Sequence, residues 1–298
     1  QRFEIIQAYF NTQLQTQLVK SSQFNADAMQ KHVNNAFKLE QQGFISKGQR
    51  MQFEVARNNA LRLLQNAQSN LNSSQFQLNH LLHQQTNGNL TTPLFVNTKQ
   101  TLPLNQFLSS YPNQSNLIRK MQIDTQLADE NVKAQRAAKK PTVFAFAEYS
   151  LDKNENWIVG VVARYNLFGG LDKNKSIESA ELKRYGSQLL VERTKQEIEN
   201  IIQKSYSEMG SSQQTQTLLN DNKRAALENL RIQELSFREN MGTANQVIDA
   251  QNAVQVIDTE MAINAYKYVL SLATLLQSHG SISQFKTYLN QPNTVYIY

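Results

Sequence analysis

Residues 60–81 read ALRLLQNAQSNLNSSQFQLNHL, and this stretch decides the fold. Within it, small or apolar residues recur at alternating spacings of four and three, which is the seam pattern of helices packed side by side. Leucine and isoleucine dominate the seam of a two-stranded zipper, whereas alanine and serine dilute this one. The stretch therefore predicts a long helix that packs closely with several others, as around a tube. The seam residues are Ala60, Leu64, Ala67, Leu71, Ser74, Leu78 and Leu81.

The same spacing returns near the end of the chain. Residues 8–9 (Ala-Tyr) and 205–206 (Ser-Tyr) match at the same offset as this second seam. Because the offset is equal in both helices of each copy, we predict two helical hairpins of matched length, with bends at residues 42–49 and 239–246. The second seam, 197 positions after the first, consists of Ile257, Met261, Asn264, Tyr268, Ser271 and Leu275.

The prolines divide the chain further, because proline breaks helix interiors. Three of the five prolines fall between residues 86 and 113. A further helix is expected after them, ending before Pro141. The predicted parts are a helical hairpin over 1–85, a linker or equatorial segment over 86–113, a second repeat over 114–279 that holds a helix, a β-hairpin and a helical hairpin, and a polar tail over 280–298.

The first copy of the repeat lacks a β-hairpin of its own in this sequence. At the repeat offset, its strands would lie upstream of Gln1. We therefore expect the sequence to be part of a longer protein, with a signal peptide and a first β-hairpin before it.

Residues 142–168 change from helical to strand periodicity. Two runs of about ten residues alternate in side-chain character and are separated by the polar stretch 152–155 (DKNE). Strands of about 9 to 11 residues with alternating faces and aromatic ends are typical of transmembrane β-barrels. The strands alone are equally compatible with a small soluble sheet that caps a helical bundle. The aromatic residues at the hairpin ends are Tyr149, Trp157, Tyr165 and Phe168.

The composition favours a few long elements over many short ones. The 298 residues include only 10 glycines and 5 prolines, which leaves little material for turns. The net charge of +6 comes from mixed acidic and basic residues without a basic stripe, so we expect no nucleic-acid partner. The absence of cysteine excludes disulfides and thiolate metal sites from this stretch. No apolar run is long enough for a transmembrane helix.

The sequence lacks the motifs of enzymes and cofactor sites. It contains no Gly-x-Ser-x-Gly, no phosphate-binding glycine loop and no His-Glu-x-x-His. His80 and His83 share a helix face, but no third ligand at suitable spacing accompanies them. We therefore expect no enzymatic activity, no cofactor and no metal.

Several short motifs lie at the helix bends and around the strand hairpin. They are GFIS at 43–46, AAKKPT at 137–142, YNLFGG at 165–170, GT at 242–243 and VIDAQ at 247–251. Together they resemble the TolC-like outer membrane efflux protein family, in the family's order of helix, helix, linker, helix, hairpin, helix, helix. The resemblance covers nearly the whole chain and implies long antiparallel coiled-coil helices that form a periplasmic α-barrel. It also implies a homotrimer whose twelve strands, four from each chain, form one transmembrane β-barrel.

The resemblance also implies a function. Family members are passive exit ducts in the outer membrane of Gram-negative bacteria, with a large periplasmic part. They export drugs or proteins in tripartite efflux or type I secretion systems, together with a periplasmic adaptor protein and an inner-membrane pump. The four aromatic residues at the hairpin ends would then lie at the interface with outer membrane lipid.

The bends of the helical hairpins would form the periplasmic mouth, where the adaptor docks and the gate lies. Family mouths commonly carry rings of aspartates, whereas here Asp249 is the main acidic candidate, so we predict weak block by multivalent cations. A second departure is Asn166, where the family often has proline. The implied tip residues are Gly43, Phe44, Ile45, Ser46, Gln49, Arg50, Gly242, Thr243, Asn245, Gln246 and Asp249.

A second interpretation of the sequence is a soluble coiled-coil scaffold or tether whose β-hairpin is an assembly cap. A membrane duct requires detergent and migrates as a trimer, whereas a scaffold of this kind is a water-soluble monomer or dimer. The oligomeric state of the full-length protein therefore separates the two hypotheses.

Overall fold

The part of the chain that the structure describes is mainly helical, with two small sheets of two strands each. It divides into two compact units, Gln1–Ser109 with Asn200–Tyr298, and Ser110–Glu199. Among the described residues, no helix holds a stretch long and apolar enough to cross a lipid bilayer. The computed structural model describes residues 2–85, 90–99, 102–150, 156–165 and 173–297.

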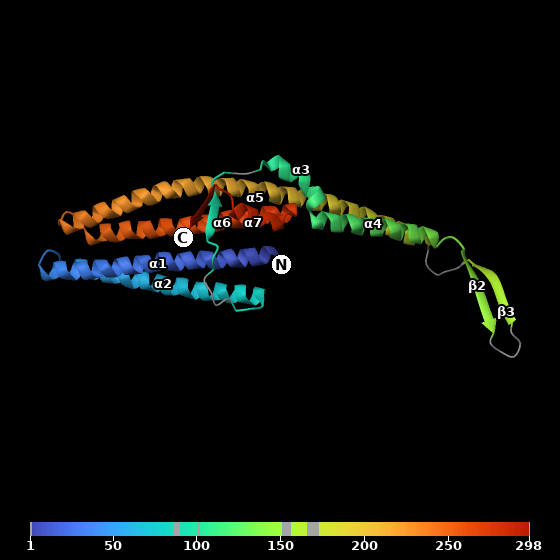
Figure 1. Ribbon diagram of the computed structural model, residues 1–298, viewed down its shortest axis with the longest axis horizontal. Helices are drawn as coiled ribbons and strands as arrows, with labels where there is room; N and C mark the ends of the chain where they lie inside the picture. Colours follow the sequence, from blue (N-terminus) through green and yellow to red (C-terminus); the bar gives the residue numbers. More distant parts are fainter. Residues whose placement is uncertain (1, 86–89, 100–101, 151–155, 166–172, 298) are drawn as a thin grey trace. The chain divides into compact units, whose positions relative to one another are not determined.

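Two long helical hairpins dominate the first unit (Figure 1). The first joins α1 (Arg2–Gln41) to α2 (Lys47–Leu82), and the second joins the end of α5 (Lys173–Arg238) to α6 (Ala244–His279). The 66 residues of α5 give on the order of 100 Å of helix at 1.5 Å per residue. Helices α2 and α6 begin 197 residues apart and also end 197 residues apart. The helices that follow the two bends therefore have equal lengths.

The helices that lead into the two bends end in the same way. Gly43 follows α1 with a φ of +77°, and its counterpart Asn240 follows α5 with a φ of +59°. Glycine and asparagine tolerate this left-handed conformation better than other residues. The N–H of the next residue, Phe44 or Met241, then donates to a carbonyl oxygen one turn back, at 2.9 Å and 2.8 Å. Both endings are Schellman motifs, which satisfy carbonyl groups that the helix leaves unpaired.

The helices that leave the bends begin in the same way too. Ser46 precedes α2 and Thr243 precedes α6, and each forms a capping box with the glutamine three residues later. In each box, the hydroxyl oxygen accepts from the glutamine N–H, and the glutamine side chain accepts from the backbone N–H of the capping residue. The two copies of the repeat thus match in their capping hydrogen bonds as well as in their seam residues.

The segment 86–113, predicted as a linker or equatorial segment, has secondary structure of its own. It contains strand β1 (Leu94–Asn97) and most of helix α3 (Leu104–Gln114). Proline 112 lies near the end of α3, where it removes one helical hydrogen bond without ending the helix earlier. Four-residue strands carry too little periodicity to be recognised from the sequence.

The predicted polar tail is also structured. It holds the short helices η1 (Ile282–Gln284) and α7 (Phe285–Leu289), followed by strand β4 (Thr294–Ile297). Strand β4 pairs antiparallel with β1, from Leu94 opposite Ile297 to Asn97 opposite Thr294. Because the two paired strands lie far apart along the chain, no local sequence pattern predicts that they pair.

An aromatic core holds these segments against the helical hairpins. Phe10 of α1, Phe95 of β1, Tyr268 of α6 and Phe285 of α7 lie with ring centroids 5.8 to 6.1 Å apart. All four side chains are buried. Most of their contacts are edge-on, which is a favourable geometry for aromatic pairs. Helix α6 is consequently covered by α1, β1 and α7.

In the second unit, α4 (Asn116–Ala137) packs along the first part of α5. The hydroxyls of Thr125 and Ser187 lie 3.0 Å apart, and Asp129 forms an ion pair with Arg184 at 3.6 Å. Helix α4 ends before Pro141, as the sequence predicted.

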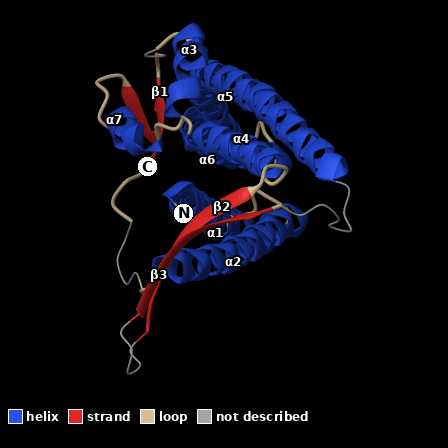
Figure 2. Cartoon of the chain, turned by 90° about the vertical axis from the view of Figure 1, so that its right-hand side faces the viewer, coloured by secondary structure: helices blue, strands red, loops and turns tan. Residues whose placement is uncertain are grey.

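The β-hairpin of this unit comprises β2 (Thr142–Ser150) and β3 (Asn156–Arg164), drawn as adjoining red strands in Figure 2. Their register places Thr142 opposite Arg164 and Tyr149 opposite Trp157. Each strand has nine residues. The predicted β-hairpin is therefore present.

Candidate functional site: the hairpin bends and the strand hairpin

The bend of the α1–α2 hairpin exposes some predicted site residues and buries another. Phe44 and Gln49 lie at the surface or close to it, whereas Ile45 points inward and is buried. Arg50 is also tied into the fold, because its guanidinium forms ion pairs with Glu40 of α1 and Glu54 of α2. Both ends of this bend are therefore held by one arginine.

The bend of the α5–α6 hairpin is mostly polar at its surface. Thr243, Asn245, Gln246 and Asp249 are exposed. Gly242 is partly covered, and a Cβ atom there would lie 3.1 Å from the backbone nitrogen of Phe237. A side chain at this position would press on the end of α5, so the glycine permits the close turn.

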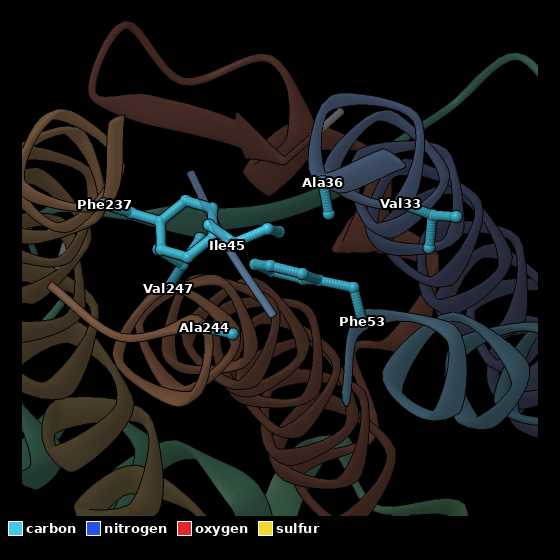
Figure 3. Packing of buried hydrophobic residues seen from close by; sticks show 7 residues of the cluster. All are labelled: Val33, Ala36, Ile45, Phe53, Phe237, Ala244 and Val247. Atoms are coloured by element: carbon cyan, nitrogen blue, oxygen red, sulfur yellow. The ribbon is translucent and has the colours of Figure 1, made fainter. Parts of the chain in front are cut away.

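A buried apolar cluster joins the two bends (Figure 3). At its centre, the ring of Phe53 from α2 contacts the edge of Phe237 from α5, with centroids 5.3 Å apart. Ile45 reaches the same cluster from the first bend, and Val247 reaches it from α6. The full set is Val33, Ala36, Ile45, Phe53, Phe237, Ala244 and Val247.

His32 of α1 lies beside this cluster in an unusual electrostatic setting. Its ring stacks on Phe53, with centroids 5.6 Å apart, and its Nε2 lies 3.7 Å from a carboxylate oxygen of Glu234. Burial lowers the pKa of His32, while the charge of Glu234 and a hydrogen bond with Gln251 offset this effect only in part. The histidine is therefore neutral at pH 7, and its protonation opposes the packing.

A cavity of about 460 Å³ opens between the two hairpins at this point. Its apolar lining includes Phe53, Phe237 and Val247, and its charged lining includes Glu234 and Arg238. The joint between the hairpins is therefore incompletely filled, which leaves room for the side chains to rearrange.

The structure brings together some of the predicted tip residues and separates others. Ile45 joins the apolar cluster between the hairpins, whereas Gln49 and Arg50 stay within the first hairpin. Asp249 is exposed on the first turns of α6. The tip positions are thus those of two helical bends, while their contact with an adaptor and their part in a gate stay predictions.

Sequence reasoning missed the residues that join the two hairpins. These are His32, Phe53, Glu234, Phe237 and Val247. A comparison of the two copies could have indicated them, because charged residues of the first copy correspond here to uncharged residues of the second. Glu40, Arg50 and Glu54 of the first copy correspond to Phe237, Val247 and Gln251 of the second.

The strand hairpin presents one face that is entirely apolar. Residues directly opposite one another in the register share a face. One face therefore comprises Val143, Ala145, Ala147, Tyr149, Trp157, Val159, Val161 and Ala163.

The opposite face of the strand hairpin is mixed. It includes Thr142, Glu148 and Arg164 together with apolar residues, and the ring of Phe146 lies over Gly160. The predicted aromatics Tyr149 and Trp157 form one pair at the turn end of the apolar face and are exposed, as is Tyr165 beyond β3. Phe168 lies outside the described residues.

The described residues contain no cluster of three or more side chains that could hold a metal ion. His80 and His83 lie close together, with ring centroids 6.4 Å apart, but His83 already has the left-handed conformation that ends α2.

Solved structures of outer-membrane channels share this fold. CusC, in a study of folding and transmembrane channel formation, aligns with a TM-score of 0.81 at 17% identity, over 92% of this chain and 66% of CusC. VceC, an outer membrane protein of Vibrio cholerae, aligns with a TM-score of 0.81 at 14% identity, over 93% of this chain and 69% of VceC.

The MtrE outer membrane channel of Neisseria gonorrhoeae, in its open state, gives a TM-score of 0.78 at 17% identity, over 94% of this chain and 66% of MtrE. The chain thus has the fold of these channels and spans about two thirds of their length. The predicted fold class, with long paired helices and a small β part, is confirmed. No protein-family model matches the sequence, and neither does any curated protein.

Proposed function

We propose that this chain forms part of the outer-membrane exit duct of a tripartite efflux pump or a type I secretion system. The duct passively conducts drugs, other small molecules or proteins from the periplasm to the exterior of a Gram-negative cell. Three copies close one tube, whose strands cross the outer membrane and whose helices extend into the periplasm. The fold shared with outer-membrane channels supports this proposal.

The apolar face of the strand hairpin is the observation that carries the proposal. All eight residues on one face, four from each strand, are apolar, and Val161 among them is 73% exposed. An isolated two-stranded hairpin with such a face is not stable in water, because it exposes both its strand edges and its apolar side chains. Lipid on the apolar face and further strands at the edges would satisfy both requirements.

The paired aromatics fit the same placement. Tyr149 and Trp157 lie opposite each other at one end of the apolar face. Tyrosine and tryptophan are enriched where a membrane-spanning strand meets the headgroup region. Nine residues per strand match the length that a tilted strand needs to cross a bilayer.

The helical bends concern the second part of the proposal, the connection of the duct to its partners. Each bend presents a surface of polar and isolated apolar side chains, among them Phe44 and Thr243. We assign these bends to the periplasmic mouth, where a periplasmic adaptor docks and connects the duct to an inner-membrane pump. The energy for transport comes from that pump.

The test is the conductance of the purified full-length protein in a planar lipid bilayer. A duct gives stable single-channel steps and migrates as a trimer in detergent. A water-soluble monomer or dimer without conductance would instead support the coiled-coil scaffold and overturn the proposal.

A pair of matched variants makes this test specific to the hairpin. Val161→Arg places a charge on the apolar face, and Val162→Arg places the same charge on the mixed face. A charge on the lipid side of a strand near mid-bilayer costs about 2–4 kcal/mol, whereas the other side faces the lumen. We expect Val161→Arg to lower the yield of inserted channels strongly and Val162→Arg to leave channels with altered conductance.

A further inference from the structure

We propose that the cavity between the two helical hairpins binds a small aromatic compound with one carboxylate and one hydroxyl group. The cavity has a volume of about 460 Å³, and helices α1, α2, α5 and α6 all contribute to its lining. Sites for small organic ligands commonly enclose about 300–1,000 Å³, so the space is sufficient for two fused rings. This inference goes beyond the proposed duct, because every residue that it uses lies within one chain. The term joint cavity is used below for this site.

The buried part of the lining is apolar. Phe53 and Phe237 contribute rings that are 1% and 7% exposed, and Val247 is 1% exposed beside them (Figure 3). Leu39 of α1 adds a fourth apolar side chain, which is half-buried. An aromatic ring in the joint cavity would therefore contact apolar atoms of both hairpins, including the two phenylalanine rings.

The exposed part of the lining is charged. Lys38 lies in the last turn of α1 and Arg238 in the last turn of α5, and both are exposed. Neither forms an ion pair with a residue in the described part of the chain. Glu234 contributes one carboxylate, and His32 is neutral, so two cations and one anion leave the lining with one positive charge. This balance favours a ligand with a single negative charge.

Two buried polar atoms at the joint cavity lack hydrogen-bond partners. They are the Nε2 atoms of His32 and Gln251, which have no partner among the described residues. His32 lines the cavity, and Gln251, which is 2% exposed, adjoins it. An unsatisfied buried polar group is costly, and native structures contain few of them. A hydroxyl group of a ligand can donate and accept, so it can satisfy both kinds of nitrogen.

The two polar regions of the joint cavity lie apart along α1. Six residues separate His32 from Lys38, which corresponds to about 9 Å along the helix axis. A carboxylate near Lys38 and Arg238 therefore leaves room for two fused rings beside Phe53 and Phe237, with a hydroxyl group near His32. This arrangement defines the class of ligand as a hydroxylated aromatic monocarboxylate.

Titration calorimetry of the purified full-length protein tests the site, with 6-hydroxy-2-naphthoate as the probe. The blank is the same detergent or lipid without protein. We expect saturable binding of one probe per chain. The analogue 2-naphthoate lacks the hydroxyl, and 6-hydroxy-2-naphthamide lacks the charge, so each should bind about fivefold more weakly. Equal affinities for the acid and the amide would overturn the charge recognition that we propose.

Substitutions of opposite sign separate recognition from damage to the fold. Arg238→Gln removes a cation and should weaken binding of the probe about fivefold, whereas Glu234→Gln removes an anion and should strengthen it about threefold. Lys20→Gln is the control, because Lys20 is exposed on α1 about 27 Å along the axis from Lys38. Weaker binding in Glu234→Gln, or equal effects of Arg238→Gln and Lys20→Gln, would contradict the site.

Hydrogen exchange locates the bound probe. A ligand that contacts both hairpins stabilises the closed joint, so a probe concentration of about ten times its Kd should slow exchange at both bends about tenfold. Exchange in α4, which belongs to the other unit, should stay unchanged. Binding without protection at the bends would place the probe elsewhere and overturn the proposal.

The joint cavity and the duct fail in different ways. Binding too weak to saturate at about 1 mM would show that water alone fills the cavity, and it would overturn this site in a protein that still conducts. A protein that binds the probe at the bends without conducting would keep the joint cavity and lose the duct.

Discussion

Replacing Phe53 by alanine should loosen the joint between the two helical hairpins. The ring is only 1% exposed and touches both Phe237 and His32. A buried Phe→Ala substitution costs about 3–5 kcal/mol, depending on how well the surroundings can collapse. The cavity of about 460 Å³ already borders this ring, so water can enter the space that the ring leaves. We therefore expect the low end of the range, about 3 kcal/mol.

Hydrogen exchange at the hairpin bends is the suitable assay, because it reports local opening without unfolding the rest of the protein. A loss of about 3 kcal/mol corresponds to roughly a 100-fold increase in the exchange rate of protected amides near the bends. Phe76→Ala is the control, since Phe76 is an exposed phenylalanine on the same helix. An increase below about fivefold at the bends would refute the role that we assign to Phe53.

The remaining predictions concern charge and capping at the bends. Burial lowers the pKa of His32, so the packed state binds a proton more weakly than the opened state does. The packed state is therefore most stable above pH about 6.5 and loses stability as the pH falls below that value. Exchange at the bends, corrected for the intrinsic rate, should therefore rise from pH about 7.5 to about 5 in the native sequence and not in His32→Gln. Ser46→Ala and Thr243→Ala each remove a cap worth about 1 kcal/mol, so exchange in the first turn of α2 or α6 should rise about fivefold and be unchanged elsewhere. In bilayer recordings, a trivalent cation added from the periplasmic side should block weakly, and Asp249→Asn should weaken the block further; strong block that survives this substitution would contradict the assignment of Asp249.

The long-range order of the helices could be predicted from the sequence, because it depends on regular spacing. The seam from Ala60 to Leu81 and its copy from Ile257 to Leu275 carry the repeat, and both helices that contain them have the predicted positions. The β-hairpin was predictable for the same reason, since its alternation runs over nine residues in each strand. In contrast, the pairing of β1 with β4 depends on two four-residue strands far apart in the chain.

The candidate site was predictable only in part. Gly43 and the capping residue Ser46 predict a bend, because these residue types favour the end of one helix and the start of the next. The apolar joint is different, because it depends on which side of each hairpin meets the other. Phe44 and Phe53 are the same residue type only nine positions apart, yet Phe44 is exposed and Phe53 is buried. The difference in burial between the two side chains arises because one hairpin packs against the other. No local sequence pattern predicts that contact.

The two copies of the repeat differ where the hairpins meet, and this difference bears on how a mouth could widen. In the first copy, Glu40, Arg50 and Glu54 hold the hairpin together by ion pairs. In the second copy, Phe237 and Val247 occupy the places of Glu40 and Arg50 and pack against Phe53.

The ion pairs of the first copy stabilise only their own hairpin, whereas the apolar cluster joins the two hairpins of one chain. Because apolar burial is the larger stabilising term, the joint between the hairpins depends mainly on this cluster. On the proposed duct, the two hairpins of one chain would therefore move as one body when the mouth widens.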